Sequence, residues 1–163
     1  MTPLYIAAEK GYTDIFQILA EKLPLEELNK PTKYGVTPLY IAAERGRTDI
    51  VRILAENLPP EELNKPRNDG VTPAIIAAHN QAIDALLELA KHGASPYASY
   101  RGVDVFSYAI KGGCALEKIP EIAQAYEDFK RGQESINKKN PRPIAKQAGA
   151  AKVAIDPEIK LEL

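Results

Sequence analysis

The chain has 163 residues, enough for one ordinary domain with a buried core, and its composition of 45% hydrophobic and 26% charged residues is typical of a soluble globular protein. The net charge of −1, from 21 basic and 22 acidic residues, gives no electrostatic reason to expect binding to nucleic acid or to an anionic membrane. No apolar run approaches the ~18 residues that span a bilayer, and the single cysteine, Cys114, excludes an internal disulfide and a cysteine-based zinc site.

Three similar segments follow one another at a constant spacing. TPLYIAAEKGYTDIFQILAE begins at Thr2, TPLYIAAERGRTDIVRILAE at Thr37 and TPAIIAAHNQAIDALLELAK at Thr72, so the spacing is 35 residues in both cases. A degenerate fourth copy, DVFSYAIKGG, begins at Asp104, 32 residues later. One such unit cannot bury its apolar face alone, so the period predicts a stack of repeats that share one core.

The second unit shows the local structure that each repeat is expected to form. Thr37 is a good N-cap, and Pro38 then takes the first helical position, where its missing N–H costs nothing. Gly46 ends this short helix in the left-handed conformation. Thr48 or Asp49 is expected to cap a second helix, whose apolar residues fall on one face at Ile50, Val51, Ile53 and Leu54.

A connector of nearly constant sequence follows each of the first two helix pairs. LPLEELNKP occupies residues 23–31 and LPPEELNKP residues 58–66. In the second copy the prolines end the helix, Leu63 is expected to pack beneath it, and Asn64 can order the exit by bonding nearby backbone. Residues 68–70 then form a turn, so the connector sets the spacing of the stack.

These residues resemble the ankyrin repeat. The family pattern G-x-T-P-L-H-x-A-A-x-x-G-H is matched by GVTPLYIAAERGR, and the similarity runs from Thr2 to about Gly113, two-thirds of the chain. The resemblance implies an all-α solenoid of helix-turn-helix units joined by turn loops. Departures are a Tyr or Ile in place of the usual His, at Tyr5, Tyr40 and Ile75, and Gln81 in place of a helix-ending Gly.

The repeat pattern also predicts the division of the chain. We expect an array over residues 1–131, with units near 2–36, 37–71 and 72–103 and a closing unit at 104–131, followed by a partly packed or flexible tail at 132–163. The second helix of the closing unit is expected near residues 116–131, with Pro120 close to its start.

The chain begins inside a repeat, with no polar capping unit ahead of it. That start suggests a fragment that other repeats precede, with Tyr5, Ile6 and Phe16 then facing solvent. A natural start with a frayed first helix is the alternative.

No catalytic set is visible in the sequence. His79 is expected to face solvent, and His92 is expected to form a local hydrogen bond. Cys114 has no histidine near it in sequence. The acidic pairs at residues 26–27 and 61–62 repeat with the unit, which indicates solvated connector positions. We therefore expect no enzyme activity, no cofactor and no metal site.

The resemblance implies a protein-interaction scaffold, because ankyrin repeats usually bind a partner protein through turn tips and the exposed positions of the first helices on the concave face. Carried over to this chain, these positions are Lys33, Tyr34, Asn68, Asp69, Tyr100 and Arg101 at the tips and Glu9, Lys10, Glu44, Arg45, His79 and Asn80 on the helices. Tyr and Arg are frequent anchors of interfaces, which favours Tyr34, Tyr100, Arg45 and Arg101 as energetic centres.

Other interpretations stay open at this point. The chain can be an accessory or targeting domain of a larger multidomain protein, such as an enzyme whose catalytic part lies elsewhere or an effector secreted by an intracellular bacterium. Family members are also hydroxylated at the connector asparagine, which maps to Asn29 and Asn64, although bracing of the turn is the favoured role. We expect a cytoplasmic monomer, in the host cytoplasm if it is a secreted effector, with no nucleic-acid or membrane partner.

Overall fold

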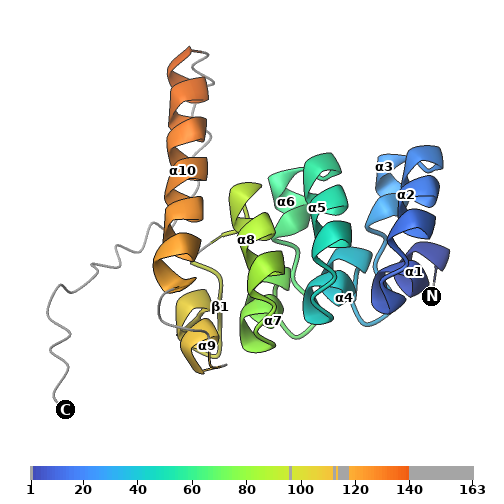
Figure 1. Ribbon diagram of the computed structural model, residues 1–163, viewed down its shortest axis with the longest axis horizontal. Helices are drawn as coiled ribbons and strands as arrows, with labels where there is room; N and C mark the ends of the chain where they lie inside the picture. The colour runs from blue at the N-terminus through green and yellow to red at the C-terminus, as the bar shows by residue number, and fades with distance from the viewer. Residues whose placement is uncertain (1, 96, 112, 114–117, 140–163) are drawn as a thin grey trace, which may run out of the picture.

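Helix pairs stacked side by side make up the fold (Figure 1). The structure is a computed structural model that describes residues 2–95, 97–111, 113 and 118–139, with side chains as far as residue 132. The pairs are α1 (Pro3–Lys10) with α2 (Thr13–Lys22), α4 (Pro38–Glu44) with α5 (Thr48–Asn57), α7 (Pro73–His79) with α8 (Ile83–Lys91), and α9 (Val105–Lys111) with α10 (Lys118–Lys139). The predicted all-α solenoid is confirmed.

The stack has two layers. The first helices contact one another in the order α1, α4, α7 and α9, and the second helices do so in the order α2, α5, α8 and α10. Small side chains allow the first helices to approach closely: the alanine pairs at residues 7–8, 42–43 and 77–78 are all buried. The core is therefore continuous along the stack and does not belong to any one repeat.

The first helices begin as the sequence predicts. The hydroxyls of Thr2, Thr37 and Thr72 each accept a hydrogen bond from a backbone N–H three residues later, over 3.2, 3.0 and 3.3 Å. Each helix then ends in a left-handed residue. This is Gly46 with φ +63° in the second unit, and in the third unit Gln81 adopts φ +61° without the freedom of glycine.

The predicted caps of the second helices are wrong. Thr48 is already the first residue of α5, the cap position belongs to Arg47, and no side chain bonds the free backbone N–H groups there. The turn after Gly46 is so tight that backbone bonds close it, because Arg47 N–H donates to the Ala42 carbonyl over 2.8 Å. A side-chain cap is absent from α2 and α8 as well.

The first repeat buries two of the three side chains that were expected to face solvent. Phe16 is fully buried and Tyr5 is 9% exposed, so the expectation that they face solvent is wrong, because both side chains pack into the shared core. Ile6 does face solvent, with an exposed fraction of 44%.

Each connector contains a helix of one turn. These are α3 (Leu25–Leu28) and α6 (Pro60–Leu63), and each ends in a leucine that packs into the core. The burial of Leu63 was predicted, whereas the helical turn was not. Proline at the start of α6 suits this turn, because its missing N–H is not needed there.

An asparagine follows each connector helix and joins it to the next unit. The Asn29 side-chain oxygen accepts from Leu39 N–H over 3.1 Å, and its amide donates to the Glu62 carboxylate over 3.1 Å. The Asn64 side-chain oxygen accepts from Ser95 N–H over 2.6 Å. These bonds agree with a bracing role for both asparagines, and they show that Glu62 is more than a solvated connector residue.

The last unit differs from the others at both of its ends. A short antiparallel hairpin, β1 (Ser99–Tyr100) and β2 (Val103–Asp104), forms its tip, and Asp104 then caps α9 by accepting from Ser107 N–H over 2.7 Å. Helix α10 rises past the end of α8 (Figure 1) and continues to Lys139, so the expected boundary at residue 131 falls inside a helix. Pro120 is its third residue, as expected, while Cys114, Leu116 and residues 140–163 lie outside the described residues.

Candidate partner-binding surface

The tip that precedes the second unit presents two exposed residues of the predicted set, Lys33 and Tyr34. Tyr34 is 63% exposed, and the Lys33 ammonium lies 4.9 Å from the centre of its ring, a cation–π distance. Both residues sit just before Gly35, whose φ of +76° makes the turn. This tip thus offers an aromatic ring and a positive charge to solvent.

Neighbouring tips are joined by hydrogen bonds. The Asn68 side-chain amide donates to the Lys33 carbonyl over 3.1 Å, and Asn68 N–H donates to the Tyr34 carbonyl over 3.4 Å. Asn68 also lies directly against Gly35, where any added Cβ would overlap it. Its side chain therefore holds two tips in register, in addition to being exposed on the surface.

A similar row of contacts links the first helices. The Asn80 amide donates to the Glu44 carbonyl over 3.0 Å, and the Arg45 guanidinium lies 3.8 Å from the Glu9 carboxylate. His79 Nδ1 lies 2.9 Å from the Asn80 side-chain oxygen. The predicted residues on these helices lie next to one another across the repeats. We call the surface formed by the tips and these helices the tip–helix face.

A hollow of about 210 Å³ opens where the tips meet the first helices. Three predicted residues line it, namely Asp69, His79 and Tyr100. Six others complete its lining, the polar or aromatic Tyr40, Arg67 and Tyr108 and the apolar Val71, Ile75 and Ile76. We call this space the tip hollow.

Tyr40 is the least expected residue of the tip hollow. Only 1% of the residue is exposed, and its hydroxyl is closed to solvent and has no hydrogen-bond partner among the described residues. Burial raises the pKa of Tyr40 to about 12, although the positive charge of Arg67 acts in the opposite direction. The phenol is therefore neutral at physiological pH.

A closed ion pair lies at the edge of the tip hollow. The Arg67 guanidinium binds both carboxylate oxygens of Asp69, with Nε 3.0 Å from Oδ1 and a second, shorter contact from Nη2 to Oδ2. The hydrogen bond from Arg67 lowers the pKa of Asp69 to about 2. The same guanidinium lies over the Tyr40 ring, 5.2 Å from its centre. The Asp69 carboxylate is therefore already paired with Arg67 of the same chain, and the tip hollow has little net charge.

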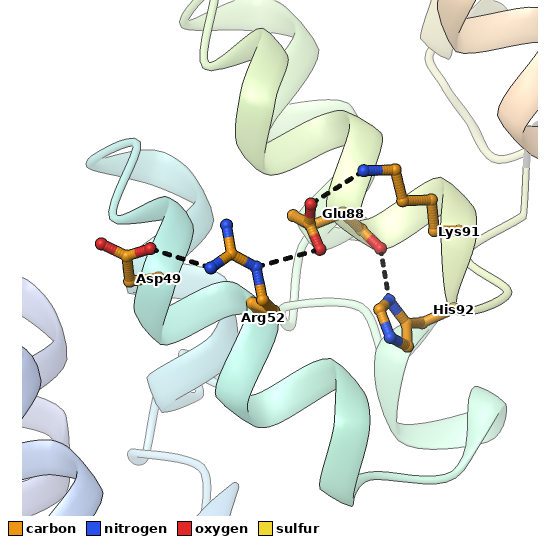
Figure 2. A network of polar contacts seen from close by, with 5 residues as sticks. All are labelled: Asp49, Arg52, Glu88, Lys91 and His92. Carbon is orange, nitrogen blue, oxygen red and sulfur yellow. Dashed lines mark hydrogen bonds and ion pairs between the residues drawn. The ribbon is translucent and has the colours of Figure 1, made fainter.

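A separate polar network belongs to the second helices (Figure 2). Arg52 of α5 lies 3.2 Å from the Asp49 carboxylate and 3.5 Å from the Glu88 carboxylate of α8, and the Lys91 ammonium donates to Glu88 over 3.0 Å. His92 Nδ1 donates to the main-chain carbonyl of Glu88 over 2.8 Å, which agrees with the predicted local bonding of this histidine. The network ties two repeats together.

Glu88 is the buried member of that network. Burial acts to raise its pKa, but the hydrogen bond from Lys91 and the charges of Lys91, Arg52 and His92 together outweigh burial and hold the pKa below its ordinary value. The equivalent residues of the first two units are Ile18 and Ile53, so a charge here is a departure from the repeat. Its contacts explain it as a structural ion pair between α5 and α8.

Within the part of the chain that the structure describes, no three residues among His, Cys, Asp and Glu are grouped as a metal site would require. No helix there is long and apolar enough to cross a membrane.

The predicted site residues thus fall into three groups. Lys33, Tyr34 and Arg101 are exposed at tips, whereas Arg45, Asn68, Asn80 and the Glu44 main chain take part in contacts between repeats. Asp69, His79 and Tyr100 line the tip hollow. The sequence interpretation missed Tyr40, Arg67 and Tyr108, although Tyr40 had been noted as a departure from the usual His.

A family model described as ankyrin repeats (3 copies) matches residues 1–64 of the chain. No curated protein matches the chain.

Proposed function

Because this chain carries ankyrin repeats, which are generally protein–protein interaction modules and typically not catalytic, we propose that it binds a partner protein through the tip–helix face. The observation that carries the proposal is the continuity of this face. Hydrogen bonds and an ion pair join residues about 35 positions apart, such as Asn68 to Lys33 and Asn80 to Glu44, into one braced surface. A braced surface loses little conformational entropy when a partner binds.

The composition of the face also supports the proposal. Tyr34 and Arg101 are of the residue types that most often dominate binding energy, and both are exposed at tips. Lys33 has no ion-pair partner among the described residues, and the same holds for Arg101, whose guanidinium lies over the Tyr100 ring. Two such cations at the tips favour a partner segment that carries acidic residues.

The experiment is an affinity capture from eukaryotic cell lysate with three baits, read by quantitative mass spectrometry. The first bait is the unaltered chain, and the second carries Lys33→Ala, Tyr34→Ala and Arg101→Asn. Asparagine is chosen because Arg101 has φ +52°, which asparagine tolerates better than alanine. The third bait removes one tyrosine and two cations elsewhere, with Tyr12→Ala, Lys22→Ala and Lys130→Ala.

A protein that is retained by the first and third baits and lost from the second supports binding through the tip–helix face. Circular dichroism establishes beforehand that all three baits keep the same helix content. The proposal fails if the second bait retains the same proteins as the first, or if the third bait loses them to the same extent.

A further inference from the structure

The buried hydroxyl of Tyr40 has no explanation within the fold. A buried polar group without a hydrogen bond lowers the stability of the folded state. The equivalent position in the next unit is Ile75, which lies buried in the same layer of first helices, so the stacking of repeats does not require a hydroxyl here. Such a group in a folded protein calls for an explanation, and a functional role is one of those known.

What distinguishes Tyr40 is that it lines the tip hollow. Tyr126 of α10 also has a buried hydroxyl without a partner, but it packs against the Phe106 ring and does not line the tip hollow. Among the described residues that line the tip hollow, Tyr40 is the one with a buried hydroxyl that lacks a hydrogen-bond partner. A molecule that enters the tip hollow can therefore supply the hydrogen-bond partner that the chain itself does not provide for this hydroxyl.

The size and walls of the tip hollow indicate the kind of guest. Its volume of about 210 Å³ lies below the range of roughly 300–1,000 Å³ that is usual for whole small-molecule ligands, so it suits one side chain. Its walls are apolar at Ile75 and Ile76 and aromatic at His79 and Tyr108, whose rings lie 5.8 Å apart with a 60° tilt. An aromatic guest makes favourable tilted contacts with such rings.

The charges around the tip hollow disfavour both a cationic and an anionic guest. Two of the ring faces already hold cations of the chain itself, Arg67 over Tyr40 and Arg101 over Tyr100, each with its guanidinium carbon 5.2 Å from the ring centre. An anionic guest would meet the carboxylate of Asp69, which already holds Arg67. The guest is therefore uncharged.

We propose that the tip hollow takes the side chain of a tyrosine from the partner protein, and that its hydroxyl oxygen accepts a hydrogen bond from the Tyr40 hydroxyl. Among aromatic residues that are uncharged at neutral pH, phenylalanine has no polar side-chain atom and tryptophan can only donate, whereas tyrosine can accept the Tyr40 proton as well as donate to the Tyr40 oxygen. The Tyr40 hydroxyl is covered while the hollow is empty, so the side chains that cover it move when the guest binds. This inference rests on the proposed function and adds the chemistry of the anchor residue.

The test uses two blocked amino acids, N-acetyl-tyrosinamide and N-acetyl-phenylalaninamide, which differ only in the phenol oxygen. Each is titrated into the ¹⁵N-labelled chain, and dissociation constants are taken from the shifts of the backbone amide signals of Val71, Ile76 and His79. The same titrations are made with Tyr40→Phe and with Tyr126→Phe, which removes the other unmatched hydroxyl away from the hollow.

The proposal predicts that the tyrosine probe shifts these signals and binds about two- to tenfold more tightly than the phenylalanine probe, as one hydrogen bond provides. The preference disappears in Tyr40→Phe and remains in Tyr126→Phe. The proposal is overturned if the probes leave these signals unchanged, bind equally, or keep their difference in Tyr40→Phe. If that happens while partner capture still depends on Lys33, Tyr34 and Arg101, the proposed function stands without this anchor.

Discussion

Removal of the Tyr40 hydroxyl is expected to make the folded chain more stable. The substitution Tyr40→Phe takes away a buried group without a hydrogen-bond partner, whose desolvation costs about 1–3 kcal/mol in folded proteins. The oxygen leaves a void of the order of 10 Å³, and such a void costs only about 0.3 kcal/mol. The net gain is therefore about 0.7–2.7 kcal/mol, which for a chain of this length raises Tm by about 1–11 °C.

The assay is urea unfolding at pH 7, followed by circular dichroism and checked by thermal scans. At this pH the phenol is neutral in the unfolded chain, and it is neutral in the folded chain as well because burial raises the pKa of Tyr40 further, to about 12, so no titration contributes to the difference. Tyr126→Phe serves as the matched variant and should give a gain of the same sign, since its hydroxyl is also unmatched. A loss of stability in Tyr40→Phe would show that the Tyr40 hydroxyl is hydrogen-bonded in solution.

Three further predictions concern residues outside the tip hollow. Replacement of Gln81 by glycine should stabilise the chain by about 0.5–1 kcal/mol in urea unfolding, because it relieves a left-handed backbone with φ +61°; a loss would show that the Gln81 side chain matters more than its backbone. Asn64→Ala should cost about 2–3 kcal/mol through the lost bonds to Ser95 N–H and to backbone carbonyls, whereas Asn57→Ala, which loses one exposed bond within its helix, should cost under about 0.5 kcal/mol. Glu88→Gln should lower stability by about 1 kcal/mol at pH 7, and unfolding measured as a function of pH should show this difference vanishing in acid. The reason is that a depressed carboxyl pKa stabilises the fold above the ordinary carboxyl pKa, and this contribution is lost as the pH falls through the folded-state pKa. A difference that persists in acid would show that Glu88 does not act through its ion pairs.

The features that follow from local sequence were predicted well. Thr37 and Pro38 start a helix by bonds within three residues, and Gly46 ends it by its own backbone freedom, so a short window of sequence is enough to place them. The period of 35 residues then places the same features in the neighbouring units. The N-caps of the second helices were missed because a tight backbone turn at Arg47 takes the place of a side-chain cap.

The parts of the surface that depend on distant residues were not predictable in this way. The bonds of Asn68 and Asn80 reach main-chain carbonyls 35 and 36 residues away, and nothing in their own segments specifies these partners. The tip hollow is built from residues of three units, so its lining emerges only once the helices are stacked. Tyr40 was visible as a departure from the repeat, but its unmatched hydroxyl is a property of the packed structure.

Isothermal titration calorimetry with a captured partner measures whether the tip–helix face binds that partner. We expect Lys33→Ala, Tyr34→Ala and Arg101→Asn together to weaken the affinity at least about tenfold, which corresponds to about 1.4 kcal/mol. The control with Tyr12→Ala, Lys22→Ala and Lys130→Ala should bind within about twofold of the unaltered chain, since surface changes outside an interface have small effects. Equal affinity of the tip variant and the unaltered chain, or a comparable loss in the control, would show that the partner does not bind through the tip–helix face.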